Sequence, residues 1–300
     1  MSGPTFRLAL LGWPARHSRS PAMHEAALRA VGLQGSYEVR EVPPEQLAEA
    51  VGALRAERFD GFNVTAPHKE AVLAHLDELE PAAERTGAVN TVVRLPDGRL
   101  RGANTDAEAV LPWLRSAGGS PRSGEHAVVV GSGGAARAVL WALASEDVHV
   151  TLVARHPARA RRLAASLGAR ADVEVCGLEE AARLRAVFAR TSVLVQASSA
   201  TFGGGAAAER FVQALPLEAL PDGTLVGELV YEPVRTALLR AAAARELPTA
   251  DGLAFLRWQG AAAFERWTGL PARHEAMARA IGESVSKQGG ESTPRFSTPR

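Results

Sequence analysis

The chain has 300 residues, of which 46% are hydrophobic and 22% charged, which is enough for two domains of roughly 100–150 residues. Its 34 basic and 33 acidic residues leave a formal net charge of +1, so no overall field favours nucleic acid or an anionic membrane. Cys176 is the only cysteine, which excludes an internal disulfide or a multi-thiolate metal site and indicates a reducing compartment. No apolar run reaches the ~18–20 residues that span a bilayer and no secretory leader is present, so we expect a cytoplasmic protein.

The first hundred residues predict an α/β layer in which short strands alternate with helices. A hairpin is expected where Pro96-Asp97-Gly98 separates two β-like runs, and a helix over 106–116 follows it. The predicted strands cover 6–11, 37–42, 61–64, 88–95 and 99–102, and the other predicted helices cover 21–31 and 45–58.

A second α/β unit begins with the β-branched run His126–Val130, which is followed at once by a glycine-rich turn and a helix through Ala144. Later strands alternate with Ala-rich helices, as in a doubly wound parallel sheet. Two helical patterns near the C-terminus are expected to pack back on the first domain. The later strands are predicted at 148–153, 172–175, 192–195 and 225–229, and the closing helices at 253–267 and 273–285.

The turn after His126–Val130 has the spacing of a dinucleotide-binding turn. Gly131 permits the tight bend, Gly133 lets the backbone approach a pyrophosphate, and Ala136 keeps helix and strand close. The helix N-terminus at Gly134 and Ala135 supplies N–H donors and a partial positive charge. The alternative is an ordinary glycine-rich turn, which the strand-turn-helix context disfavours.

The end of the second strand of this unit favours NADP over NAD. An NAD site places a carboxylate there for the ribose 2′-hydroxyl, whereas this chain has Ala154-Arg155-His156 and then Arg159. A 2′-phosphate carries a charge of roughly −1.5 to −2 and pairs well with a guanidinium such as that of Arg155. The alternative is a solvated basic start to a helix.

Lys69 and three asparagines stand out because their residue types are otherwise almost absent. Only Lys69 and Lys287 are lysine among the 34 basic residues, a skew that we interpret as GC-rich coding bias. A residue type that persists despite this bias is expected at positions where the residue favoured by the bias cannot perform the same role. The asparagines are Asn63, Asn90 and Asn104.

Short polar side chains follow several strand ends of the first half and predict a pocket for a polyhydroxylated substrate. Ser18 and Ser20 lie in the loop after the first strand, where Ser20 is equally suited to cap the next helix. Asn63, Thr65 and Lys69 share the loop after the strand at 61–64.

Asp106 follows the predicted hairpin, and a lysine with a nearby aspartate can move a proton or stabilise a developing alkoxide. The alternatives are a solvated surface cation for Lys69 and a helix N-cap for Asp106. The predicted fold class is α/β, with an N-terminal α/β substrate domain, a doubly wound Rossmann-type NADP domain and C-terminal helices returning to the substrate domain. The expected limits are 1–105, 106–248 and 249–285, with a disordered tail at 286–300.

Taken together, these segments resemble the shikimate dehydrogenase family. The resemblance runs from about Phe6 to Ile281, and its motifs occur in the family's order. Glu228 and Phe255 stand where the family more often has Asp and Met. The motifs are the serine loop 12–21, Gly61-Phe62-Asn63-Val64-Thr65-Ala66-Pro67-His68-Lys69, the segments 87–91, 102–106 and 131–138, Tyr231-x-Pro233-x-x-Thr236, and Gln259-Gly260 with Phe264-x-x-Trp267-Thr268-Gly269.

The resemblance implies a reversible NADP-linked reduction of 3-dehydroshikimate to shikimate, in the pathway to chorismate and the aromatic amino acids. It makes Lys69 and Asp106 the catalytic pair, with Asp106 orienting Lys69. The residues implied to hold the substrate are Ser18, Ser20, Asn63, Thr65, Asn90, Tyr231 and Gln259. Those expected to hold NADP are Gly131, Gly133, Gly134, Ala135, Ala136, Arg155 and Arg159.

Two other functions are compatible with the same residues. One is a quinate or quinate/shikimate dehydrogenase of the same superfamily, and the other is a non-catalytic sensor of shikimate-like ligands, which the presence of both Lys69 and Asp106 disfavours. We expect a small-molecule substrate, no nucleic-acid or membrane partner, and a monomer or homodimer. No metal is expected because the 8 histidines are scattered along the chain.

Overall fold

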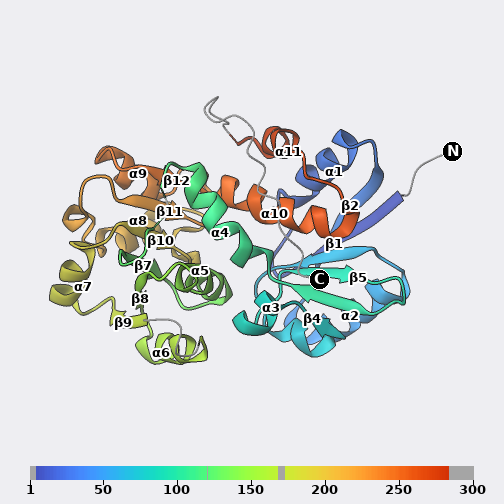
Figure 1. Ribbon diagram of the computed structural model, residues 1–300, viewed down its shortest axis with the longest axis horizontal. Coiled ribbons are helices and arrows are strands. Elements are labelled where there is room, and N and C mark those ends of the chain that lie inside the picture. Colours follow the sequence, from blue (N-terminus) through green and yellow to red (C-terminus); the bar gives the residue numbers. More distant parts are fainter. Residues whose placement is uncertain (1–4, 120, 168–172, 284–300) are drawn as a thin grey trace.

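The computed structural model describes residues 5–119, 121–167 and 173–283, which form two α/β domains side by side (Figure 1). One domain is built on a six-stranded mixed sheet and the other on a six-stranded parallel sheet, so the predicted α/β class is confirmed. Within those residues, no helix combines the length and the apolar character needed to cross a bilayer. The tail predicted to be disordered at 286–300 lies outside the described residues.

The N-terminal sheet has the strand order β2-β1-β3-β5-β6-β4. β1 is parallel to β2 and β3, whereas β5 is antiparallel to both β3 and β6. The antiparallel pair of β5 and β6 is the predicted hairpin. Its strands are β1 (Thr5–Gly12), β2 (Gln34–Glu41), β3 (Gly61–Val64), β4 (Glu78–Leu79), β5 (Thr91–Arg94) and β6 (Leu100–Ala103). Its helices are α1 (Ser20–Ala30), α2 (Leu47–Ala56) and α3 (Pro81–Thr86), with short 3₁₀ turns at Pro44–Gln46 and Ala71–His75.

Alternate residues of β1 face the two sides of this sheet, as the two-residue period of a strand requires. Leu8 and Leu10 pack with α1 and with helices from the C-terminal end of the chain. Ala9 and Leu11 pack with α2 and α3 on the other side. Because both faces are covered, the buried part of the strand, Leu8–Leu11, is an unbroken apolar run, whereas the polar residues Thr5 and Arg7 lie at its exposed beginning.

The second sheet is parallel throughout, with the order β12-β11-β10-β7-β8-β9. Counted from β7, this is the 3-2-1-4-5-6 order that defines the dinucleotide-binding doubly wound fold, with its switch point between β7 and β10. The strands are β7 (His126–Val130), β8 (His149–Ala154), β9 (Val173–Gly177), β10 (Val193–Gln196), β11 (Leu225–Glu228) and β12 (Thr249–Ala250). The helices are α5 (Gly134–Ala144), α6 (Pro157–Ser166), α7 (Ala181–Phe188), α8 (Gly205–Gln213) and α9 (Ala237–Ala244), with 3₁₀ turns at Ser199–Thr201 and Leu217–Ala219.

Two long helices, α4 (Thr105–Ser116) and α10 (Gly252–Thr268), run between the domains and pack on each other (Figure 1). Arg266 of α10 forms ion pairs with Glu108 of α4 at 2.5 Å and with Glu80 of the first domain at 2.9 Å. The last helix, α11 (His274–Ile281), packs against α1. The predicted return of the C-terminal helices to the first domain is therefore confirmed.

Besides 3₁₀ turns, the described residues include two short strands and one short helix that the sequence did not predict. β4 and β12 have two residues each, and α3 has six. A two-residue strand contains a single repeat of the strand period and a six-residue helix fewer than two turns, which is too little for periodicity to reveal them.

Candidate active site

The predicted catalytic lysine and the predicted dinucleotide turn lie against each other where the two domains meet. A Cβ built on Gly134, the first residue of α5, would lie 3.7 Å from Lys69 Cδ. Close by, Arg137 Nη2 of α5 lies 3.8 Å from the carboxylate oxygen of Glu70, the residue after Lys69. The N-terminus of α5 therefore borders the loop that carries Lys69.

Lys69 Nζ donates a hydrogen bond to Asp106 Oδ2 at 2.5 Å. The side chains are only 19% and 7% exposed, so Lys69 is not a solvated surface cation. Asp106 is not the helix cap either, because Asn104 caps α4 by accepting a hydrogen bond from Ala107 N at 3.1 Å. A short loop after β3 and the first turn of α4 thus bring the pair together across 37 residues of chain.

Asn90 holds the other oxygen of the same carboxylate. Its Nδ2 donates to Asp106 Oδ1 at 2.8 Å and lies 2.9 Å from Thr105 Oγ1. Its Oδ1 accepts a hydrogen bond from Thr105 N at 2.7 Å, so both the NH₂ group and the oxygen of the Asn90 amide bind the first turn of α4. Gln259 reaches the group from α10, with its Oε1 3.3 Å from Asn90 Nδ2. The carboxylate of Asp106 is therefore fixed from both sides, by Asn90 and by Lys69.

Asn63 belongs to the same buried polar network. Its Nδ2 donates to Asn90 O and to Thr91 Oγ1, both at 3.0 Å. Its Oδ1 accepts a hydrogen bond from the phenol of Tyr37 at 2.8 Å. The sequence reasoning did not identify Tyr37, Thr91 or Thr105 as part of the site.

The serine loop and the loop after β11 meet beside this network. Ser18 Oγ accepts from Ser20 N at 3.2 Å, and no side chain caps α1, so Ser20 does not serve as its cap. The Ser18 hydroxyl lies close to the phenol of Tyr231, and burial raises the pKa of that phenol. Thr65 is half-buried at the end of β3, where its Cγ2 fills the space beside Gly12. The hydrogen-bond network thus joins Asn63, Asn90 and Gln259 to the Lys69–Asp106 pair, and Ser18 and Tyr231 meet beside it.

The turn after β7 fits a bound dinucleotide. Gly131 has φ +129°, a conformation that side chains rarely adopt, and its N–H donates to Val153 O at 2.9 Å. No atom lies within 4 Å of the position of a Cβ at Gly133, which leaves open space above the backbone for a pyrophosphate. The first N–H groups of α5, at Gly134, Ala135 and Ala136, have no partner within the helix and can donate to that group.

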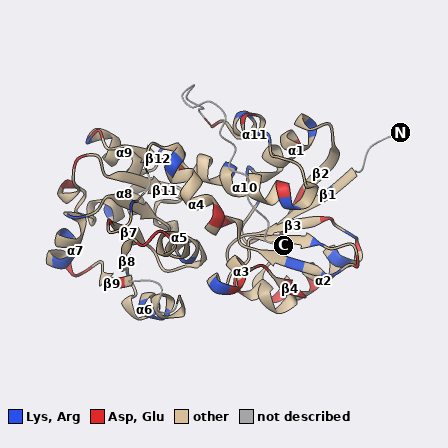
Figure 2. Cartoon of the chain, viewed as in Figure 1, with Lys and Arg blue, Asp and Glu red and all other residues tan. Residues whose placement is uncertain are grey.

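Arg155 directly follows β8, which pairs with β7, so it lies beside the turn at Gly131. Arg155 and Arg159 are both exposed, as expected for groups that meet a charged ligand from solvent. Arg159 is one of three arginines on α6, whose ribbon carries the blue of basic residues in Figure 2. The residues present therefore fit the 2′-phosphate of NADP.

Glu228 is a buried group that sequence reasoning noted only as a departure from the family. It ends β11, accepts from Thr201 Oγ1 at 2.8 Å and from Val230 N at 3.0 Å, and is 0% exposed. Burial raises the pKa of this carboxyl to about 7. Glu228 thereby ties the turn after β10 to the loop that carries Tyr231.

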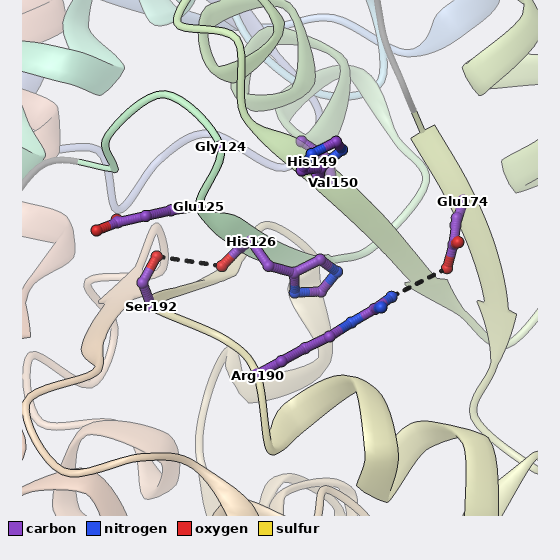
Figure 3. A pocket seen from close by; sticks show the side chains of 8 residues that line it. All are labelled: Gly124, Glu125, His126, His149, Val150, Glu174, Arg190 and Ser192. Atoms are coloured by element: carbon purple, nitrogen blue, oxygen red, sulfur yellow. Dashed lines mark hydrogen bonds and ion pairs between the residues drawn. The ribbon is translucent and has the colours of Figure 1, made fainter.

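A hollow of about 480 Å³ lies at the amino-terminal ends of β7 and β8, whereas the turn at Gly131 follows the carboxyl-terminal end of β7 (Figure 3). Polar side chains that line it already interact with protein groups. His126 Nε2 is hydrogen bonded to Thr151 Oγ1 at 2.9 Å, and Arg190 forms an ion pair with Glu174 at 3.3 Å. It contains no residue of the predicted site. Across the described parts of the chain, His, Cys, Asp and Glu nowhere gather in threes suited to a metal ion.

The dinucleotide-binding strand order, together with a lysine–carboxylate pair against the N-terminus of α5, defines a two-domain NADP-dependent oxidoreductase. Comparisons with known proteins narrow this class. Residues 10–92 match the model of the shikimate dehydrogenase substrate binding domain. A shikimate dehydrogenase (NADP(+)) of Thermus thermophilus is 44% identical over 280 residues, which cover 92% of this chain and 99% of that protein.

Solved structures agree with that match. A crystal structure of shikimate 5-dehydrogenase from Thermus thermophilus, in complex with NADP(H) and shikimate, is 40% identical with a TM-score of 0.79 and covers 92% of this chain and 98% of that one. Quinate dehydrogenase from Corynebacterium glutamicum, in complex with NAD, is 29% identical with a TM-score of 0.80 and covers 92% and 98%. The chain belongs to the shikimate dehydrogenase family.

Proposed function

We propose that this protein catalyses the reversible NADP-linked reduction of 3-dehydroshikimate to shikimate, a step of aromatic amino acid biosynthesis. The observation that carries the proposal is the pair of Lys69 and Asp106, joined at 2.5 Å and set against the first residue of α5. This position puts a proton-bearing group next to the place where a nicotinamide dinucleotide enters the fold. Relatives named shikimate dehydrogenase (NADP(+)) support the same reaction.

In this proposal Lys69 acts on the oxygen of the reacting carbon. When bound, NADP accepts or supplies the hydride. In the direction of reduction the oxygen gains negative charge, and the ammonium of Lys69 donates a proton to it or stabilises it. Asp106 orients Lys69 and is itself held by Asn90, so the ammonium stays aimed at one point.

The surrounding amides and hydroxyls hold the ring of the substrate. Ser18, Ser20 and Tyr231 stand together at one end of the pocket, where hydroxyl donors suit a carboxylate. The other end has amide and hydroxyl groups that suit ring hydroxyls, because each buried polar group needs a partner when water leaves. These groups belong to Asn63, Thr65, Asn90 and Gln259.

NADP is proposed to lie across the turn Gly131–Ala136, with its 2′-phosphate at Arg155 and Arg159. Three less specific features stay part of the proposal: a cytoplasmic location, a monomeric or homodimeric state, and a division of the chain at about residues 105, 248 and 285. Quinate is the second candidate substrate, because the quinate dehydrogenase of Corynebacterium glutamicum has a TM-score of 0.80 with this chain.

An absorbance assay for NADPH tests the proposal. The purified protein is supplied with NADP⁺ and either shikimate or quinate, and then with NAD⁺ in place of NADP⁺. We expect NADPH to form with shikimate at a kcat/KM at least ~10-fold above that with quinate, a difference of about 1.4 kcal/mol. Absence of turnover with shikimate would refute the proposed function, and a preference for quinate would replace it with the second candidate.

A further inference from the structure

Glu41, the last residue of β2, binds the backbone of the serine loop. The register of β1 and β2 places Glu41 beside Gly12, where that loop begins. Its Oε1 accepts hydrogen bonds from two backbone N–H groups of the loop, Ala15 N at 3.0 Å and Arg16 N at 3.3 Å. One carboxylate oxygen therefore holds two consecutive residues of the loop.

The guanidinium of Arg16 binds the other oxygen of the same carboxylate. Its Nη2 lies 2.7 Å and its Nε 3.0 Å from Glu41 Oε2. Hydrogen bonds from this guanidinium lower the pKa of the Glu41 carboxyl to about 2, so the acceptor is an ionised carboxylate. The Arg16 side chain is 70% exposed, and an ion pair with so exposed a partner contributes little. The two backbone bonds are therefore the part of the contact that can fix the loop.

The contact at Ala15 continues to both serines. Ser18 N donates to Ala15 O at 3.0 Å, and Ser18 Oγ in turn accepts from Ser20 N at 3.2 Å. Ala15 is 7% exposed and packs in the core of the first domain, so this residue is a firm point of attachment. A continuous series of hydrogen bonds thus runs from the carboxylate of Glu41 to the two hydroxyl-bearing residues.

The serine loop lies between β1 and α1, so no strand ladder or helix fixes its backbone. Its beginning is attached to the loop of Lys69, because Trp13 N donates to Ala66 O at 3.1 Å. Its end is attached to α11, because Arg19 Nη1 donates to Ile281 O at 2.7 Å. The carboxylate on β2 holds the middle of the loop. A loop that is ordered before the ligand arrives binds it more tightly, because binding then loses less conformational entropy.

We propose that Glu41 is a positioning residue for the substrate: by binding two backbone N–H groups, it holds the serine loop in the conformation that presents Ser18 and Ser20 to the ligand. This inference rests on the proposed function, because it takes the two hydroxyls to bind the carboxylate of a cyclic polyol substrate. Glu41 acts through the loop, and it takes no part in proton transfer.

Glu41→Ala removes the acceptor of both backbone N–H groups, so the loop has to be ordered when the substrate binds. We expect the KM and the Kd for shikimate to rise about 3- to 10-fold. The kcat should stay within about twofold and the KM for NADP⁺ should stay unchanged, because Lys69 and the turn at Gly131 keep their contacts. Initial rates give the kinetic constants, and calorimetry gives the Kd without turnover.

Three further variants separate the backbone bonds from the charge. Glu41→Gln keeps an amide oxygen that can accept the same bonds, and Arg16→Ala leaves both bonds in place, so each should stay within about twofold of the wild type. Glu38→Ala removes another carboxylate of β2, which forms an ion pair with Arg40, and should leave every constant unchanged.

An unchanged KM and Kd for shikimate in Glu41→Ala would overturn the inference. So would an equally large rise in Glu41→Gln or Arg16→Ala, because that result assigns the effect to charge. Equal losses in every kinetic parameter with a lowered melting temperature would mark a purely structural role and overturn it as well. If the wild-type protein neither binds nor oxidises shikimate, the proposed function fails and this inference fails with it; if the wild type works and Glu41→Ala matches it, only the inference fails.

Discussion

On the substrate side of the site, Asn63, Asn90 and Asp106 are each 5% exposed or less, and protein atoms fill most of their hydrogen-bonding positions. On the cofactor side, Arg155 and Arg159 are exposed, and the turn at Gly133 leaves open space. The substrate side therefore holds its hydrogen-bonding groups in fixed orientations, which suits the recognition of one small ring. The cofactor side is a backbone turn with open space and exposed arginines beside it, which a bound dinucleotide can contact.

This difference predicts two kinds of sensitivity. A change in the buried network alters the direction of a group that is already fixed, so chemistry and substrate selection should suffer. A change among the exposed arginines removes one charge contact to the cofactor, so cofactor affinity should suffer while the chemistry survives. The variants below test this contrast.

The largest effect is expected for Lys69→Ala. Loss of a general acid or a charge stabiliser lowers rates by ~10²–10⁴-fold, so we expect that loss in kcat with a modest change in KM for shikimate. Steady-state kinetics with shikimate and NADP⁺ measure it. Lys69→Arg serves as the companion variant, because it keeps a positive charge that cannot be released. A Lys69→Ala enzyme in which only KM changes would reduce Lys69 to a binding residue.

Arg155→Ala should act on the cofactor alone. A charge-assisted hydrogen bond contributes about 1.5–3 kcal/mol, so the KM for NADP⁺ should rise about 10- to 100-fold. The KM for NAD⁺, which has no 2′-phosphate, should stay constant and the preference for NADP⁺ should fall accordingly. Arg210→Ala, an exposed arginine on α8 of the same domain, controls for a general change of charge. An unchanged ratio between the two cofactors would remove Arg155 from the site.

Glu228→Gln tests the buried carboxyl group at the end of β11, in the second domain. Its pKa is raised from 4.5 to about 7, so the folded protein binds this proton more tightly than the unfolded chain does. The stabilisation by the neutral form is complete below pH 4.5 and is lost as the pH rises through 7. A neutral amide should therefore raise the free energy of unfolding by about 1–3 kcal/mol at about pH 8, and by less at about pH 5.

Urea denaturation at the two pH values measures that difference, with the exposed Glu49→Gln as control. A stabilisation of equal size at both pH values would mean that Glu228 does not titrate in this range. A loss of stability at the higher pH would show that its hydrogen bonds with Thr201 and Val230 need the carboxylate form.

The sequence was most informative where a residue type was rare or where a strand was followed directly by a glycine-rich turn. Lys69 was singled out by its rarity, and the strand His126–Val130 with the turn after it was predicted with the bounds that β7 has in the structure. Tyr37 was missed because an aromatic residue in a β-run is ordinary, and its contact with Asn63 of β3 depends on how β2 and β3 flank β1 in the sheet. Glu228 was seen only as a departure from the family, since its neighbours Thr201 and Thr236 come from separate loops.

The same limit applies to Asn90. Its rarity marked it, but its two-sided grip on Thr105 and Asp106 depends on the hairpin returning the chain to the start of α4. Contacts between distant segments of this kind follow from the packing of the sheet, which local patterns do not encode.

A crystal structure of the protein with shikimate and NADP⁺ bound tests the central claim most directly. The account predicts that Lys69 Nζ lies within hydrogen-bonding distance, ~2.7–3.2 Å, of the shikimate oxygen on the carbon that faces the nicotinamide. It also predicts that Asp106 still contacts Lys69 in that complex. Shikimate bound elsewhere, or with Lys69 turned away from the oxidised carbon, would contradict the account.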